Sequence, residues 1–233
     1  MTLALTLDHA VRRLCPEVAQ RVEAKKFKRL TEAELWRELA CCVLSSQVRY
    51  ETALAAAKAL ATENVFVDFL TGKSERYLRQ RTLHVLRSPL QVGNRPVYFR
   101  FPYSKAKQLV RTRTALLDAG LRLRDLVYDT CAERRKRRLL IQVVSGFGPK
   151  QSSMFLRAAG ASYDLAILDT HALAFMRLLG LAPADHTPPY LPLPRYERLE
   201  ADFEHYANAV GYRLGYVDWA VWIVMRAVRE LGR

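Results

Sequence analysis

The sequence predicts an all-α protein. In most segments of the 233-residue chain, apolar residues recur every three or four positions, which is the spacing of one helix face. No segment shows the alternation of a convincing sheet. Half of the residues are hydrophobic, which is enough for a core. The length suits one compact domain or two closely joined lobes.

The predicted helices follow one another with few breaks. The first spans 7–26 and keeps its apolar residues on one face. Thr31 opens the second as its N-cap, and Glu34, three residues later, completes a capping box. Further helices are predicted at 51–61, 73–87, 104–119, 129–145, 150–160, 169–180, 195–210 and 216–231.

Two segments interrupt the helices. Residues 88–103 contain prolines, a glycine and an asparagine and are predicted to be a loop with a brief extended piece at 97–99. Ser104 is expected to cap the next helix and Gly120 to end it. Residues 182–194 hold five prolines and are expected to form a rigid surface connection.

Charge points to a polyanionic partner. The formal net charge is +14 and the isoelectric point is about 9.9, which favours a nucleic acid over a generally basic soluble protein. The basic run 133–138 is expected to be a solvated helix face or to follow DNA phosphates. No run of residues is apolar and long enough for a membrane span, and we expect no signal peptide.

The four cysteines show neither a disulfide framework nor zinc spacing. They are Cys15, Cys41, Cys42 and Cys131, with no Cys-x-x-Cys pair among them. Cys41 and Cys42 lie in an apolar helical run and are expected to be reduced core residues. This usage fits a reducing cytoplasm.

The segment Gly146-Phe147-Gly148-Pro149-Lys150 is the first candidate site. The two glycines can adopt backbone angles closed to other residues and let a phosphate approach the main chain. Pro149 fits the first turn of a helix, whose free amides form an anion site. The alternative is a tight turn between helices that binds nothing.

Lys150 and Asp169 are the candidate reacting groups. A lysine at a helix start is disfavoured by the helix dipole unless it binds phosphate or loses its proton, and a neutral lysine can form a Schiff base. Asp169 follows an apolar run and could stabilise a cationic sugar or move protons. Each residue has a simpler alternative, a phosphate contact for Lys150 and an N-cap for Asp169. Together they suggest removal of damaged bases from DNA.

The chain resembles the helix-hairpin-helix (HhH-GPD) DNA glycosylases, which include endonuclease III, the adenine glycosylase and the 8-oxoguanine DNA glycosylase/lyases. The hairpin Gly-x-Gly-x-Lys is followed by Leu168-Asp169-Thr170-His171 in the family's order and spacing. Three weaker matches are similar to the short microbial 8-oxoguanine class or to the wider family, namely Leu44-Ser45-Ser46-Gln47, Arg100-Phe101-Pro102-Tyr103-Ser104-Lys105-Ala106 and Asp218-Trp219-Ala220-Val221-Trp222.

The resemblance implies roles for particular residues. Lys150 would form the Schiff base and Asp169 would be the essential acid. The residues expected to contact DNA are Gln47, which would fill the gap left by a flipped base, Gly146, Gly148 and His171. Trp222 and Arg233 are expected at the base pocket, although the class often ends in lysine. Backbone carbonyls of Gln142, Val144 and Phe147 would hold a structural Na⁺ or K⁺ ion.

The same resemblance implies the organisation and activity. A central helical barrel is expected at 30–154, with the hairpin at about 139–154, and a second lobe from 1–29 plus 155–233. No cysteine follows Cys131, so no iron–sulfur cluster is expected, and no cofactor is required. The expected activity is that of a monomeric, bifunctional glycosylase/AP lyase for 8-oxoguanine in double-stranded DNA, acting in the cytoplasm at the nucleoid. The alternatives are a glycosylase for oxidised pyrimidines and a non-catalytic DNA-binding module.

Overall fold

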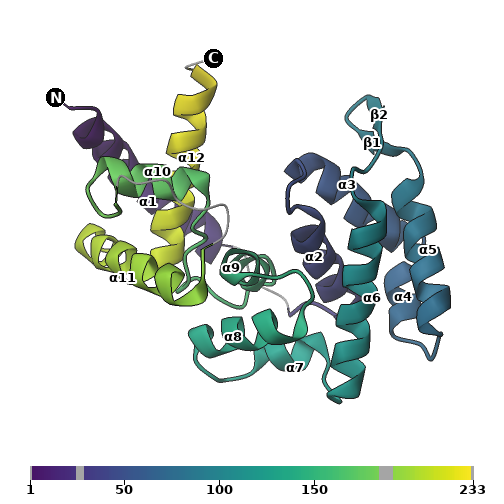
Figure 1. Ribbon diagram of the computed structural model, residues 1–233. Coiled ribbons are helices and arrows are strands. Elements are labelled where there is room, and N and C mark those ends of the chain that lie inside the picture. The colour runs from purple at the N-terminus through teal and green to yellow at the C-terminus, as the bar shows by residue number, and fades with distance from the viewer. Residues whose placement is uncertain (1, 25–28, 184–190, 232–233) are drawn as a thin grey trace. The chain divides into compact units, whose positions relative to one another are not determined.

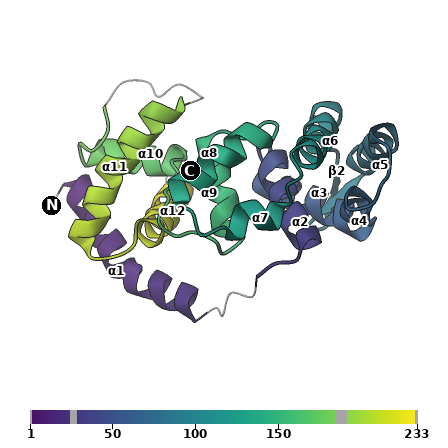
Figure 2. The ribbon, with the colours of Figure 1, turned by 90° about the horizontal axis from the view of Figure 1, so that it is seen from below.

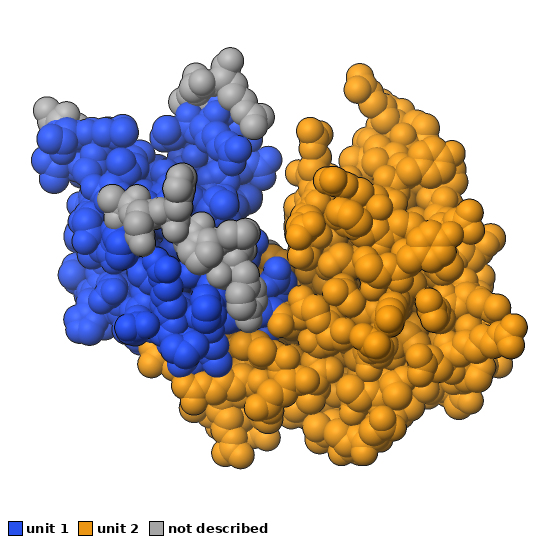
Figure 3. Space-filling view, viewed as in Figure 1, with its two compact units in different colours: residues 1–28, 148–153, 160–233 blue, residues 29–147, 154–159 orange. Residues whose placement is uncertain are grey.

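The computed structural model describes residues 2–24, 29–183 and 191–231, which form helices and one short hairpin (Figure 1). The predicted all-α class is confirmed. Within these ranges no helix is long and apolar enough to cross a membrane. The chain divides into two compact units, coloured separately in Figure 3.

Unit 2 consists of residues 29–147 and 154–159. Its elements are α2 (Glu32–Leu44), α3 (Tyr50–Thr62), α4 (Val65–Phe69), α5 (Glu75–Arg87), β1 (Leu90–Val92), β2 (Arg95–Val97), α6 (Pro102–Asp118), α7 (Leu123–Tyr128) and α8 (Glu133–Val143). Trp36 lies edge-on to Phe69, with ring centroids 5.0 Å apart, and both rings are buried. Cys41 and Cys42 are buried free thiols, as predicted.

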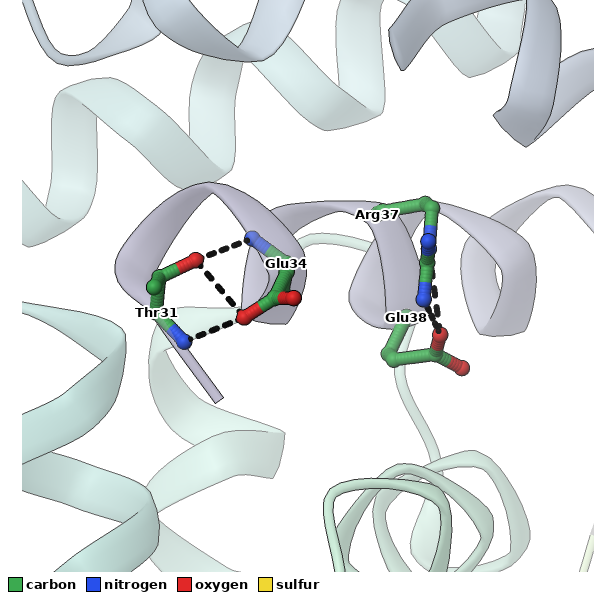
Figure 4. Close-up of polar contacts among 4 residues, drawn as sticks. All are labelled: Thr31, Glu34, Arg37 and Glu38. Atoms are coloured by element: carbon green, nitrogen blue, oxygen red, sulfur yellow. Dashed lines mark hydrogen bonds and ion pairs between the residues drawn. The ribbon is translucent and has the colours of Figure 1, made fainter. Parts of the chain in front are cut away.

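The capping box at the start of α2 is present (Figure 4). The Glu34 N–H donates to Thr31 Oγ1, while Thr31 N–H donates to Glu34 Oε2 at 2.7 Å. These bonds satisfy amide donors that lack partners inside the helix. Arg37 and Glu38 pair one turn further on, at an exposed position where such pairs add little stability.

The loop predicted at 88–103 contains a β-hairpin that was not predicted from the sequence. β1 and β2 pair antiparallel, with Leu90 opposite Val97. Gly93 has φ of 59°, the sign that the first residue of a two-residue type II′ turn requires. The Gly93-Asn94 dipeptide between short β-prone runs was the available signal.

Two further expectations about unit 2 are wrong. Ser104 is not a cap, because α6 begins at Pro102 after the N-cap Phe101; proline suits the first helical position. The basic run 133–138 is not a uniformly solvated face, because Lys136 is only 6% exposed and Arg137 is fully buried. Lys136 pairs with Glu133 at 3.3 Å, which partly compensates the burial of its charge. Gly120 follows the end of α6 with φ of 64°, as predicted.

Unit 1 consists of residues 1–28, 148–153 and 160–233. Its helices are α1 (Leu3–Glu23), α10 (Thr170–Leu178), α11 (Leu193–Val210) and α12 (Leu214–Leu231). α12 packs against α1, α10 and α11, and Figures 1 and 2 show these four helices as one group. Their shared core includes Val11, Phe175, Phe203 and Val217. It therefore joins both ends of the described chain.

Helix α9 (Pro149–Ala158) belongs to both units. Its residues 149–153 group with unit 1, and its residues 154–158 group with unit 2. The sequence-based division at 154/155 put Lys150 and Asp169 in different lobes, whereas the structure groups both with unit 1. A helix is a continuous rod, so its two ends can join different cores. The position of a residue in the chain therefore does not show to which unit it belongs.

Candidate active site

The hairpin turn joins α8 to α9 and is held by α6. Val144 leaves the helix with an extended backbone, φ −95° and ψ 111°, and its carbonyl accepts the Phe147 N–H at 3.2 Å. The Ser145 N–H donates to Thr112 Oγ1 at 3.0 Å. That hydroxyl donates in turn to the Gln108 carbonyl. The turn is thus tied to a helix more than thirty residues earlier in the chain.

Gly146 is favoured by its backbone angle and has a close side-chain neighbour. Its φ is 88°, and an added Cβ would lie 2.6 Å from Gln108 Nε2. The structure records no positive φ for Gly148; this glycine is buried instead. The expectation that both glycines use unusual angles therefore holds for Gly146 only. Gln108 was not predicted from the sequence, because a contact between α6 and the turn leaves no local signal.

Lys150 lies in the first turn of α9, directly after Pro149. The Ser152 N–H donates to the Gly148 carbonyl at 3.1 Å, so the helical hydrogen bonds begin at the second glycine. Lys150 is partly buried. The macrodipole disfavours its positive charge at this end of the helix.

Asp169 is the N-cap of α10, as its sequence position suggested. Its Oδ1 accepts the N–H groups of His171 at 2.8 Å and Ala172 at 2.9 Å. Both bonds end on one oxygen, so the cap does not use Oδ2. The cap alone therefore does not exclude a catalytic role for the same carboxylate. Asp169 is partly buried.

The segment before Asp169 is held by side chains of α11 and α12. Glu200 Oε1 accepts the Ala166 N–H at 3.0 Å, and Asp218 Oδ2 accepts the Ile167 N–H at 3.1 Å. The Tyr196 hydroxyl accepts the Leu168 N–H at 3.0 Å and donates to the Ala166 carbonyl at 2.8 Å. These three buried residues had no predicted role, apart from Asp218 as part of the matched 218–222 segment.

The remaining residues that were predicted to contact DNA or the flipped base lie just after α2, on α10 and α12, or outside the described residues. Gln47 follows α2, is exposed and has φ of 62°, a region uncommon for residues other than glycine. His171 is partly buried in the first turn of α10. Trp222 on α12 is 36% exposed, and the Arg226 guanidinium lies 5.2 Å from its ring centre. Arg233 lies outside the described residues.

A buried lysine on α6 was also not predicted. Lys105, in the first turn of this helix, is 6% exposed. Burial lowers the pKa of its ammonium group below the ordinary value. It lies one turn before Gln108 on the same helix. In the sequence, Lys105 was noted only as part of the Arg100–Ala106 stretch that resembles the short microbial class.

The carbonyls expected to bind a cation lie at and just after the end of α8. The last four carbonyls of a helix lack partners within it, and this end carries a partial negative charge. Gln142 is in the last turn of α8, and Val144 and Phe147 are in the turn that follows. Among the described residues, no group of three or more His, Cys, Asp or Glu could hold a metal.

Known proteins resemble this chain over most of its length. Residues 18–212 match the family model described as Ogg-HhH, 8-oxoguanine DNA glycosylase. A Thermotoga petrophila protein named 8-oxoguanine DNA glycosylase/AP lyase is 31% identical over 91% of this chain and 90% of its own length. The crystal structure of the Thermotoga maritima 8-oxoguanine DNA glycosylase superposes with a TM-score of 0.67 at 29% identity and covers 94% of both chains. A Methanocaldococcus jannaschii 8-oxoguanine glycosylase/lyase, crystallised with a 15mer DNA containing 8-oxoguanine, shares the fold with a TM-score of 0.69 at 22% identity and covers 93% of this chain and 95% of its own.

Proposed function

Because this chain belongs to the 8-oxoguanine DNA glycosylase family, we propose that it excises 8-oxoguanine from double-stranded DNA and then nicks the strand. The observation that carries the proposal is a lysine at the hairpin exit and a capping aspartate in one compact unit of a chain with this family match. The chain also has the strong positive charge that binding to a phosphate backbone needs.

Lys150 is the nucleophile of the proposed reaction. Its neutral amine attacks C1′ of the damaged nucleotide, and the bond from C1′ to the base breaks, with the electron pair leaving on the base. The base takes up a proton, and the attacking nitrogen loses one. Ring opening gives an imine between Lys150 and the sugar. Loss of the C2′ proton then breaks the C3′–O bond and nicks the strand.

Asp169 supports this chemistry as a carboxylate. It stabilises the positive charge that develops on the sugar as the base departs, and it accepts a proton from the attacking amine. Its geometry favours this role, since the cap uses Oδ1 and leaves Oδ2 for the substrate. Because the cap needs only one oxygen, chemistry and folding can be separated by substitution.

The remaining residues hold the DNA. Turn amides at Gly146 and Gly148 and the His171 side chain bind backbone phosphates, which confers affinity without sequence preference. Gln47 fills the gap that the flipped nucleotide leaves, and its left-handed backbone supports this assignment, because strained residues gather at functional sites. Trp222 stacks on the extruded base, and Arg233 contributes to the same pocket.

Three further features complete the proposal. The enzyme acts as a monomer in the cytoplasm, at the nucleoid where its DNA substrate lies. No cofactor takes part in the reaction. A Na⁺ or K⁺ ion binds the carbonyls of Gln142, Val144 and Phe147 and supports the hairpin.

The oligomeric state can be measured directly. Light scattering during gel filtration should give the mass of one 26.7 kDa chain, and a value of twice that mass would contradict the monomer.

Borohydride trapping tests the nucleophile. The wild-type protein, incubated with an 8-oxoguanine duplex and borohydride, is expected to form a covalent adduct, because borohydride reduces the imine to a stable amine. Lys150→Gln should form none. Lys58→Gln is the matched control, since it removes the same charge from an exposed lysine on α3 and should trap normally.

The same assay separates the alternatives. Trapping only on a duplex with an oxidised pyrimidine would reassign the substrate. Lesion-independent binding without any adduct would indicate a non-catalytic DNA-binding module. In that case Lys150→Gln would reduce affinity alone. Trapping that persists in Lys150→Gln would place the nucleophile elsewhere.

A further inference from the structure

We propose that Tyr196, Glu200 and Asp218 are positioning residues that hold the Asp169 carboxylate in its reactive place. The three side chains come from α11 and α12 and are here named the Asp169 cradle. Each is nearly or fully buried, with exposures of 1%, 0% and 2%. The inference rests on the proposed function, because it assumes that Asp169 takes part in the reaction.

The cradle supplies hydrogen bonds that regular structure does not. Residues 166–168 belong to no helix or strand, and Ala166 and Leu168 are buried. Buried backbone groups must find partners. Here each of the three consecutive N–H groups donates to a different cradle side chain, at 3.0, 3.1 and 3.0 Å. The path of the chain into Asp169 is therefore determined by α11 and α12.

A short relay connects the cradle to Asp169 itself. Asp218 Oδ2 accepts the Ile167 N–H, and the Ile167 carbonyl accepts the Asp169 N–H at 2.7 Å. The Tyr196 hydroxyl bridges the Ala166 carbonyl and the Leu168 N–H. A shift in either side chain would thus move the backbone within two residues of the carboxylate.

α12 also contacts the chain three residues before this segment. The Gly215 N–H donates to the Tyr163 carbonyl at 2.8 Å, and a Cβ on Gly215 would lie 2.7 Å from that carbonyl oxygen. Only glycine allows this approach. Asp218 lies one turn further along α12 and Trp222 one turn beyond it, on the same face. One helix therefore carries both the cradle acid and the proposed base-stacking residue.

The cost of burying these groups supports a positioning role. Two carboxyl groups and a phenol in a core are expensive unless they are hydrogen-bonded, and well-packed apolar residues are often no less stable. Asp169 needs no cradle to cap α10, because its cap bonds run to His171 and Ala172. A catalytic carboxylate, in contrast, needs its place to be constant to within a fraction of an ångström.

Tyr196→Phe tests the inference with Tyr206→Phe as the matched control. Both tyrosines are on α11 of unit 1, and the Tyr206 hydroxyl donates to Asp8 at 2.7 Å, away from residues 166–169. Each variant keeps its ring and loses one hydroxyl. Both should fold and bind the 8-oxoguanine duplex with unchanged Kd. We expect the single-turnover excision rate to fall roughly ten- to a hundredfold in Tyr196→Phe only.

The Asp169→Asn background makes the test specific. The asparagine side chain keeps an oxygen for the cap, so the fold persists while the carboxylate chemistry is lost. If Tyr196 acts through Asp169, Tyr196→Phe should slow the residual excision of Asp169→Asn by far less than it slows the wild type. An equal slowing in both backgrounds would overturn the inference, as would equal rates for Tyr196→Phe and Tyr206→Phe.

Failure of the proposed function is distinguishable from failure of the inference. Wild-type activity in Asp169→Asn would remove Asp169 from the mechanism, whatever Tyr196→Phe does. If Tyr196→Phe is too unstable to assay, Glu200→Gln and Glu200→Ala replace it. Glu200→Gln keeps an acceptor oxygen for the Ala166 N–H, so its excision rate should stay near that of the wild type, whereas the rate of Glu200→Ala should fall. If the rate falls in neither variant, the inference is wrong.

Discussion

Gly146 shows how one residue shapes the hairpin. Its φ of 88° strains any residue with a Cβ, and a Cβ added there would displace the Gln108 side-chain amide, while the neighbouring Ser145 N–H is bound by Thr112. The turn that precedes Lys150 is therefore supported from α6 as well as from its own backbone. A change at Gly146 should disturb both the fold of unit 2 and the approach of a phosphate.

Gly146→Ala is expected to lower the free energy of unfolding by roughly 1–3 kcal/mol, from left-handed backbone strain and the displaced Gln108 side chain. Urea unfolding measures this loss. Gly120→Ala is the control, because Gly120 has φ of 64° and a Cβ added there would meet nothing within 4 Å. Gly120→Ala therefore carries only the cost of the strained backbone. If it lowers the free energy of unfolding as much as Gly146→Ala does, displacement of the Gln108 side chain costs nothing.

At the scale of elements, helix ends provide most of the candidate chemistry. The start of α9 carries Lys150, the start of α10 is capped by Asp169, and the end of α8 provides carbonyls. Helix starts attract anions and helix ends attract cations. The three ends thus suit the phosphate contacts, the catalytic carboxylate and the structural cation that we propose, respectively.

The cation proposal predicts a dependence on the salt that is used. Replacing K⁺ by tetramethylammonium at equal ionic strength should lower the melting temperature, because a bulky organic cation cannot reach the carbonyls of residues 142–147. Circular dichroism measures the shift. Tetramethylammonium screens charges as K⁺ does, so a melting temperature that is the same in both salts would rule out a cation that stabilises the hairpin.

For the whole molecule, charge sets the mode of DNA binding. The chain has 37 lysines and arginines against 23 acids. Contacts to phosphates release counterions, so the binding constant should fall steeply with salt, with a slope of about −0.9 per phosphate contacted. In the proposed mechanism, recognition of the lesion depends on the extruded base and adds little to this slope.

Binding of Lys150→Gln to lesion and undamaged duplexes should therefore give parallel lines of log K against log salt. This variant prevents turnover during the measurement. Fluorescence anisotropy between roughly 50 and 200 mM KCl covers the range over which six phosphate contacts would cost about a thousandfold in affinity. Lines that diverge with salt would mean that ionic contacts, and not the base, distinguish the lesion.

Patterns within a few residues were visible in the sequence. The helical class, the capping box at Thr31 and the Asp169 cap all follow from hydrogen bonds that span three or four positions. The hairpin carrying Lys150 was evident for the same reason. The β-hairpin at Gly93 was also a local pattern, and the Gly-Asn turn was the signal that would have shown it.

Only the tertiary structure shows which side chains support the candidate site residues. Tyr196, Glu200 and Asp218 reach the backbone before Asp169 across 28, 34 and 51 positions. Lys136 and Arg137 are buried although their run of charges resembled a solvated face. Local spacing governs bonds inside one helix, but the partner of a buried polar group depends on which helices pack together, and only the folded chain determines that.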